Sequence, residues 1–202
     1  MFTTTRTARC GLLVAGLALA LPAGVAFAAE SYTLDAVHSQ PRYEIQHMKG
    51  LSTQTGYFTK LNGKVMLDRA AKKGTIDVTI DTTSIRTHDA ARLDAIVKGE
   101  QYFNVEKYPT MNFKSANLTF DGDKLVGAEG ELTMIGVTKP VSLKVVNFTC
   151  AENPFNKKPM CGGEATATIK RSEWGMKTGI PTATSDDVKI VIPIEAYLDG
   201  AG

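Results

Sequence analysis

The sequence predicts an all-β domain of antiparallel strands with one short helix, and three observations lead to this prediction. Apolar and polar residues alternate in many short runs, which is typical of strands with one buried face. Turn-forming residues separate the runs, as in the stretches 61–63, 71–74 and 120–124. Helical periodicity is confined to one stretch, so we expect a meander of strands that closes into a barrel or a sandwich.

The alternating runs cover most of the chain after residue 40. Because side chains two residues apart in a strand share a face, each run brings its apolar members to one side. No linker, repeat or low-complexity tract interrupts the runs, so we expect a single domain. The residues that share the apolar face of each run are Tyr43, Ile45 and His47; Val65 and Leu67; Ile76, Val78 and Ile80; Met111 and Phe113; Val141, Leu143 and Val145; Ala165, Ala167 and Ile169; and Val188, Ile190, Ile192 and Ile194.

One stretch, residues 88–98, departs from the alternation and predicts a short helix. Leu93, Ile96 and Val97 share a helical face. Thr87 or Asp89 is suited to cap the N-terminus, and Gly99 is suited to end the helix. A lone helix beside a barrel usually covers an open end or an edge.

The N-terminal segment has the composition of a secretory signal peptide. Two arginines precede an apolar run over residues 11–21, and an A-x-A pattern of small residues ends at Ala28. The run is shorter than the about 20 apolar residues that span a bilayer, so a cleaved signal is favoured over a permanent anchor. We therefore expect residues 1–28 to be removed and residues 29–202 to form the mature domain.

Removal of this segment changes the charge of the protein. The whole chain has 23 basic and 21 acidic residues. Two arginines and no acid leave with the signal, so 21 basic residues then face 21 acidic ones. This balance gives no support for nucleic-acid binding. No apolar segment after residue 28 is long enough for a membrane span.

Two cysteines remain in the mature chain, Cys150 and Cys161. In an exported domain such a pair is most simply a disulfide. The residues between them include two prolines and two asparagines, which favour turns, so the bridge is expected to join the strands of a hairpin. Metal binding is the weaker alternative, because the chain has no C-x-x-C pair.

The sequence offers little support for an enzyme. The three histidines lie on separate segments without a metal-binding spacing. His38 and Ser39 are adjacent, and adjacent residues of a strand point to opposite faces. Asp186 and Asp187 are better explained as a polar turn before a strong strand. Gly-rich phosphate loops and a Gly-x-Ser-x-Gly elbow are absent. We therefore expect no catalytic residue, no metal ligand and no cofactor.

Seven blocks of the chain follow one another in a characteristic order. They are Tyr32-Thr33-Leu34-Asp35 with His38-Ser39, Gly56-Tyr57-Phe58, residues 81–87, residues 102–115, residues 130–141, residues 170–175 and Asp186-Asp187-Val188. These blocks and their order resemble the YceI-like family of exported bacterial proteins, whose domains bind polyisoprenoids or other lipids. The resemblance extends from about Tyr32 to Tyr197, nearly the whole mature chain.

The resemblance implies an extended, lipocalin-like antiparallel β-barrel of about eight strands with a short helix near one end. It also implies a tunnel that holds a long isoprenoid or other acyl chain, and, as in several members, a homodimer. Pro41 stands where the family usually has an aliphatic residue. Because proline lacks the ladder donor, we expect the strand to begin at Arg42 or to be irregular there. Trp174 stands where phenylalanine is usual and is expected to narrow the tunnel.

We therefore expect a periplasmic protein that carries or sequesters a long apolar ligand. The ligand classes are a polyisoprenoid, an isoprenoid quinone and a fatty acyl chain. Two alternatives stay open: an enzyme that acts on a lipid in the same barrel, and a protein-interaction module whose interior is filled by side chains. His47 and Arg171 are candidates for the head-group end. The candidates for the tunnel wall are Tyr43, Ile45, Phe58, Ile80, Leu93, Ile96, Phe103, Phe113, Met134 and Trp174.

Overall fold

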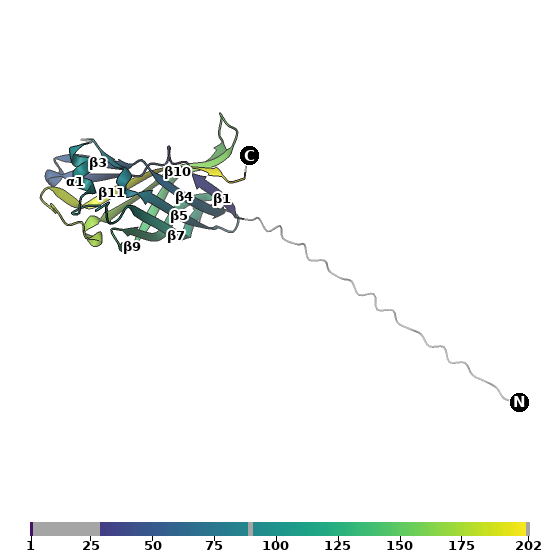
Figure 1. Ribbon diagram of the computed structural model, residues 1–202. Helices are drawn as coiled ribbons and strands as arrows, with labels where there is room; N and C mark the ends of the chain where they lie inside the picture. The colour runs from purple at the N-terminus through teal and green to yellow at the C-terminus, as the bar shows by residue number, and fades with distance from the viewer. Residues whose placement is uncertain (2–28, 89–90, 201–202) are drawn as a thin grey trace.

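A computed structural model describes Met1 and residues 29–88 and 91–200. The strands form an elongated barrel, with α1 at one end and the β9–β10 hairpin at the other (Figure 1). The predicted signal peptide lies, apart from Met1, outside the described residues, and so does Asp89. The described part of the chain has no helix of sufficient length and hydrophobicity to span a bilayer.

The described residues form eleven strands, one α-helix and three short 3-10 helices. The strands are β1 (Glu30–Leu34), β2 (Arg42–His47), β3 (Ser52–Phe58), β4 (Leu61–Asp68), β5 (Lys73–Asp81), β6 (Ile85–Thr87), β7 (Thr110–Asp121), β8 (Lys124–Met134), β9 (Val137–Glu152), β10 (Pro159–Lys170) and β11 (Thr184–Leu198). The helices are η1 (Met48–Gly50), η2 (Thr82–Ser84), α1 (Arg92–Lys98) and η3 (Arg171–Trp174).

Eight of the strands close into a barrel. The hydrogen-bonded order is β1-β4-β5-β7-β8-β9-β10-β11, and β11 pairs back with β1. Closure is antiparallel and joins Tyr32 to Leu198 and Leu34 to Ala196. The prediction of an all-β, lipocalin-like antiparallel barrel of about eight strands with one short helix is therefore confirmed.

Three further strands extend the sheet beyond this closure. The first half of β11 pairs with β2, and β3 and β6 follow in order. β2 begins at Arg42, as predicted from the preceding proline. The carbonyl of Pro41 accepts a hydrogen bond from the N–H of Phe58 at 2.9 Å, so the proline still takes part in the sheet through its only backbone polar group.

The helix is shorter than predicted, and its attachment differs from the prediction. Thr87 does not cap it: Thr87 ends β6, and its N–H and hydroxyl donate to the Asp94 carboxylate at 2.7 and 2.8 Å. The N-cap position is Ala91, which makes no side-chain cap bond. Gly99 does end the helix, with its N–H bonded to the Ile96 carbonyl at 3.1 Å. A carboxylate inside the helix thus binds the strand before it, and this bond holds α1 against β6.

The apolar interior consists of two clusters along the barrel axis. One contains Phe58, Met111 and Trp174. The other contains Tyr32 and Leu67 and includes Cys161. Cys161 faces Cys150 across β9 and β10 and forms a disulfide with it, with sulfur atoms 2.02 Å apart. The predicted disulfide is therefore confirmed.

Candidate functional site

A cavity of about 620 Å³ occupies the interior of the barrel. Every strand and α1 contribute to its wall, and residues of both apolar clusters line it. The volume lies in the range of small-molecule sites, roughly 300–1,000 Å³. The interior is therefore hollow, and the alternative of a barrel filled by side chains is wrong.

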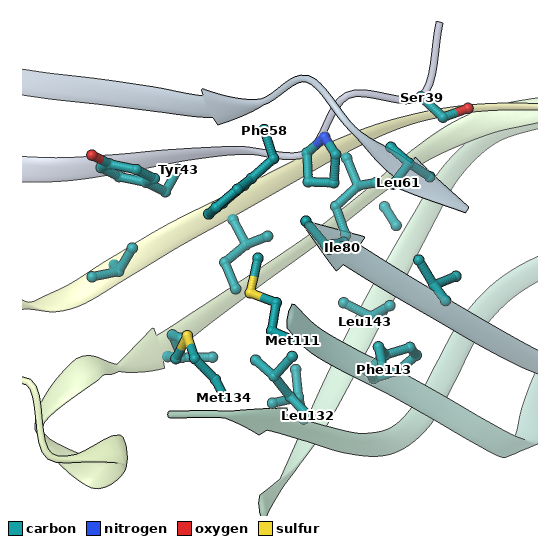
Figure 2. Close-up of a pocket in the computed structure, with 18 of the residues that line it drawn as sticks. Ser39, Tyr43, Phe58, Leu61, Ile80, Met111, Phe113, Leu132, Met134 and Leu143 are labelled. Atoms are coloured by element: carbon teal, nitrogen blue, oxygen red, sulfur yellow. The ribbon is translucent and has the colours of Figure 1, made fainter. Parts of the chain in front are cut away.

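Large apolar side chains from facing strands converge on this space. Phe58 and Ile80 approach it from β3 and β5, while Met111, Leu132 and Met134 approach it from β7 and β8 (Figure 2). Inward-pointing residues alternate along each strand, because period two brings every second side chain to the same face. The alternating runs of the sequence thus became the wall of the cavity.

Eleven of the twelve candidate residues line the cavity, and their contact with a ligand stays a prediction. Trp174 is the exception. Its side chain is 2% exposed, and its indole N–H donates to the Leu132 carbonyl at 3.2 Å, within the wall. The strand pattern ends at η3, so alternation no longer predicts the direction of this side chain. Because Trp174 is not among the lining residues, it does not narrow this cavity, and its contact with a ligand also stays a prediction. The candidates on the cavity wall are Tyr43, Ile45, His47, Phe58, Ile80, Leu93, Ile96, Phe103, Phe113, Met134 and Arg171.

Arg171 lines the cavity, but its guanidinium is committed to the protein. Its side chain is 3% exposed. Its Nε donates to the Ser185 carbonyl at 3.0 Å, and Nη1 donates to the Met176 carbonyl at 2.9 Å. Nη2 donates to the Thr178 carbonyl at 2.9 Å and to the Thr184 hydroxyl at 2.7 Å. Burial lowers the pKa of this group, yet arginine stays protonated in proteins. Its visible role is to hold residues 176–185 at this end of the barrel.

Polar side chains of the cavity wall gather at the end that α1 covers. His47, Gln54 and Thr55 come from the β2–β3 hairpin, and Tyr102 follows α1. The Tyr43 hydroxyl belongs to the same wall, and burial, with smaller contributions from Asp94 and Tyr102, raises its pKa to about 12. The hydroxyl is therefore neutral near pH 7 and acts as a hydrogen-bond donor and acceptor.

The opposite half of the cavity was missed by the candidate list. Leu67, Leu125, Phe148 and Cys161 line it, together with Tyr32, whose hydroxyl donates to Glu30 at 2.9 Å. The list favoured aromatic residues and residues inside the family blocks. The period-two runs were the signal that could have found this half, because Leu67 and many other members of those runs lie on the wall.

The cavity reaches the surface beside α1. Among the described residues of its wall, only Arg92 and Ile96 are exposed, and both belong to this helix. The lining residues at the disulfide end are buried or half-buried. As predicted for a lone helix beside a barrel, α1 covers an open end.

The described wall carries no carboxylate, and its titratable groups are tyrosines, arginines and one histidine. Outside it, Asp35, His38 and Glu195 form the one group in the described chain that brings three metal-ligating atoms within 4.8 Å of one another. His38 Nδ1 lies 2.8 Å from Asp35 and 3.9 Å from Glu195. This hydrogen bond raises the pKa of His38 and lowers that of Asp35. The group joins a turn to β11, and none of its three residues lines the cavity.

Comparison with known proteins agrees with the geometry. The YceI-like domain family matches residues 32–196. Protein YceI of Escherichia coli O157:H7 is 36% identical over 182 residues, which cover 88% of this chain and 91% of that protein. The chain belongs to the YceI-like domain family. Protein YceI of Salmonella arizonae is 33% identical to this YceI-like domain over 175 residues, with 85% and 88% of the two chains covered.

Solved structures share the fold of this YceI-like domain. BcnA of Burkholderia cenocepacia superposes with a TM-score of 0.68 at 24% identity and covers 80% of this chain and 98% of its own. A protein of Saccharophagus degradans, described as a polyisoprenoid binding domain, has a TM-score of 0.61 at 17% identity, with coverage of 83% and 98%. These two likenesses concern the fold alone.

Proposed function

We propose that this YceI-like domain carries or sequesters a long apolar chain in the periplasm, with the chain held inside the barrel. The ligand classes proposed are a polyisoprenoid, an isoprenoid quinone and a fatty acyl chain. The observation that carries the proposal is the cavity of about 620 Å³, whose described wall is apolar for most of its length and has no carboxylate. The description of the Saccharophagus degradans protein as a polyisoprenoid binding domain supports the first of these classes, the polyisoprenoids.

Length alone supplies affinity in such a cavity. Each buried methylene contributes about 0.8 kcal/mol, so ten of them contribute roughly 8 kcal/mol before the costs of association. Association costs about 4–15 kcal/mol, and each further methylene adds to the surplus over that cost, so affinity increases with chain length. Specific polar contacts along the chain are therefore not required, which suits the apolar half lined by Leu67, Leu125 and Phe148.

The polar end is suited to orient a neutral head group. The Tyr43 hydroxyl has no hydrogen-bond partner among the described residues and lines the cavity. A ligand carbonyl or hydroxyl placed there would form a hydrogen bond with the Tyr43 hydroxyl, which makes none with the described part of the protein. The proposal gives Tyr43 the role that the sequence assigned to Arg171, because the guanidinium donors of Arg171 already bind protein oxygens.

Binding is favoured over catalysis by the groups on the wall. General acid–base chemistry needs titratable groups that converge on one point. The described wall has one histidine, His47, and no carboxylate that could pair with it. Its tyrosines Tyr32 and Tyr43 have pKa values raised to about 12 and stay protonated near neutral pH. We therefore propose a binding protein without a catalytic residue.

Export to the periplasm is part of the proposal and rests on residues 1–28, which have the order of a signal peptide. Intact mass of the exported protein tests it, because cleavage after Ala28 leaves Ala29 as the first residue. A mass that retains the first 28 residues would refute this part. The homodimer implied by the family resemblance stays a prediction, and sedimentation of the purified protein tests it.

The experiment that tests the binding function is extraction of the exported, purified protein with organic solvent, followed by mass spectrometry. A co-purifying chain is the expected result, and its mass distinguishes the three ligand classes. Chemical conversion of that chain by the protein would favour the enzyme alternative. Protein that carries no chain, and takes up none when it is offered, would refute the proposal.

A further inference from the structure

The cavity opens among exposed apolar and basic side chains at the α1 end of the barrel. Leu51 is 87% exposed, Met48 is 48% exposed and Ile96 is 44% exposed. Met48 and Leu51 lie between β2 and β3, and Ile96 lies on α1. Figure 1 shows β3 and α1 at the same end of the barrel. We call residues 48–51, 91–98 and 177–182 the collar. Exposed apolar groups around an opening commonly mark an interaction site.

Hydrogen bonds hold the collar against neighbouring parts of the same end of the barrel. The N–H of Met48 donates to the carbonyl of Ala183 at 2.8 Å, which joins η1 to the residue after the third segment. The Thr55 hydroxyl lies 2.5 Å from Nε2 of His88, which joins the β2–β3 hairpin to the chain before α1. Ala183 and Thr55 line the cavity, so these bonds place η1 and the hairpin beside the opening.

The tip of the collar holds an unfavourable backbone conformation. Met48 and Lys49 both have positive φ, at 48° and 56°, and neither is glycine. Such conformations cost energy for residues with a Cβ and cluster at functional sites. Here the conformation accompanies exposure of Met48 and Leu51 to solvent, and neither residue belongs to the two apolar clusters of the interior.

The charge of the collar is positive, although the mature chain is formally neutral. Its three segments contain Lys49, Arg92, Lys98 and Lys177, and one acid, Asp94. Asp94 is 7% exposed and accepts hydrogen bonds from Thr87. Lys49 and Lys177 are exposed and pair with no described carboxylate. The surface around the opening is thus apolar and cationic together.

We propose that the collar docks on an anionic phospholipid bilayer, with Leu51 and Met48 inserted at its interface and the lysines beside lipid phosphates. Apolar side chains flanked by cations are the composition of interfacial membrane binders. The proposal rests on the proposed function, because a docked opening would let an apolar chain pass between bilayer and cavity without crossing water. The third segment, residues 177–182, supplies Lys177 and no acid.

The test is flotation of the mature protein with vesicles of phosphatidylcholine, alone or mixed with phosphatidylglycerol. We expect binding to the mixed vesicles that weakens as salt is added, because salt screens the lysines. Leu51→Ser should weaken binding about ten-fold or more, since one leucine leaves the apolar phase. Lys49→Glu should weaken it about five-fold or more.

Matched control variants exist at the other end of the barrel. Phe155 is 93% exposed at the tip of the β9–β10 hairpin, and Lys158 follows it in the same turn. Phe155→Ser and Lys158→Glu make the same kinds of change away from the collar, and we expect them to leave vesicle binding unchanged. Equal binding by wild type and the collar variants, or loss only in the hairpin variants, would overturn the proposal.

Extraction of the same proteins separates this proposal from the function on which it rests. Leu51→Ser should still yield a co-purifying chain, because Leu51 is outside the cavity wall. If the wild-type protein carries a lipid chain but binds neither kind of vesicle, the docking proposal is overturned and the binding function stands. Vesicle binding that depends on Leu51, from a protein without any chain, supports docking and counts against the carrier function.

Discussion

The ring of Tyr43 lies directly over Gly56 on the neighbouring strand. The two residues face each other across β2 and β3. A Cβ built on residue 56 would lie 2.5 Å from ring atom Cε1 of Tyr43 and 2.6 Å from its hydroxyl oxygen. The glycine therefore makes the space in which the phenol of the proposed head-group site lies.

Replacing this glycine should displace the phenol. We expect Gly56→Ala to lower the free energy of unfolding by about 1–3 kcal/mol, as overpacking does, and to weaken ligand retention. Urea denaturation measures the first effect. In a Tyr43→Ala background the same change should cost much less, because the clash has gone. An equal cost in both backgrounds would contradict this account of the pair.

Extra bulk inside the cavity should compete with the ligand. Ile45 lines the cavity and is only half-buried, so Ile45→Trp should reduce chain retention while the fold stays intact. In a close-packed core the same change would cost about 1–3 kcal/mol. Circular dichroism and quantitative extraction measure the two effects. The control is Gln46→Trp, whose side chain is exposed on the next residue of the strand and should leave retention unchanged.

The contact between α1 and β6 should control how tightly the opening is covered. Asp94→Ala removes the acceptor of two hydrogen bonds from Thr87, and we expect a loss of about 1–3 kcal/mol. Hydrogen exchange of residues 92–98 should increase more than that of the barrel strands. Asp77→Ala removes an exposed carboxylate that pairs with Lys114 and should cost about 1 kcal/mol or less. Uniform exchange changes in both variants would argue against a local role.

The disulfide should stabilise the whole domain by limiting the unfolded chain. Cys150 and Cys161 are 11 residues apart, which corresponds to about 3 kcal/mol or somewhat less in the chain-entropy account. We expect the double alanine variant to lose this amount in urea denaturation. Wild-type protein treated with reductant should lose a similar amount. A stability unchanged by both treatments would show that the bridge is dispensable.

Acid should lower the stability of the barrel closure between β1 and β11, which we call the seam. Asp199 accepts hydrogen bonds from Ser31 and Thr33 at 2.6 Å and from Lys64 at 3.1 Å. These bonds lower its pKa from 3.8 to about 2. Because the pKa is lower in the folded state, the charged carboxylate stabilises the fold above pH 3.8. That contribution is lost as the pH falls toward 2.

Thermal unfolding across this pH range tests the seam. Asp199→Asn should unfold at a lower temperature than wild type at neutral pH, and the difference should shrink between pH 3.8 and about 2. Asp123→Asn, in the turn between β7 and β8, serves as the control and should show no such pH-dependent difference. A gap between Asp199→Asn and wild type that grows in acid would contradict the sign of this effect.

The strands were predictable because the signal for them is local. Alternation at Val65 and Leu67, or at Val188 and Ile190, reports the buried face of a strand without knowledge of its neighbours. The signal failed at Trp174, where η3 interrupts the strand pattern. The capping preference failed at Thr87, because this residue ends β6 and donates its own N–H and hydroxyl to Asp94 inside the helix. Capping preferences concern the free N–H groups of the helix itself, and they do not predict such a contact between a strand and a helix.

The sequence by itself determined the antiparallel strands, the disulfide pair, the family and most of the side chains that face inward, because each follows from local period, spacing or motif. Only the tertiary structure decided that these side chains surround a cavity. The same apolar residues can fill a barrel or line one, since the interior volume depends on strand number and stagger. The number and stagger of the barrel strands depend on the pairing of β11 with β1, two strands that lie at opposite ends of the described chain. The same closure placed the polar groups and the exposed collar at one end.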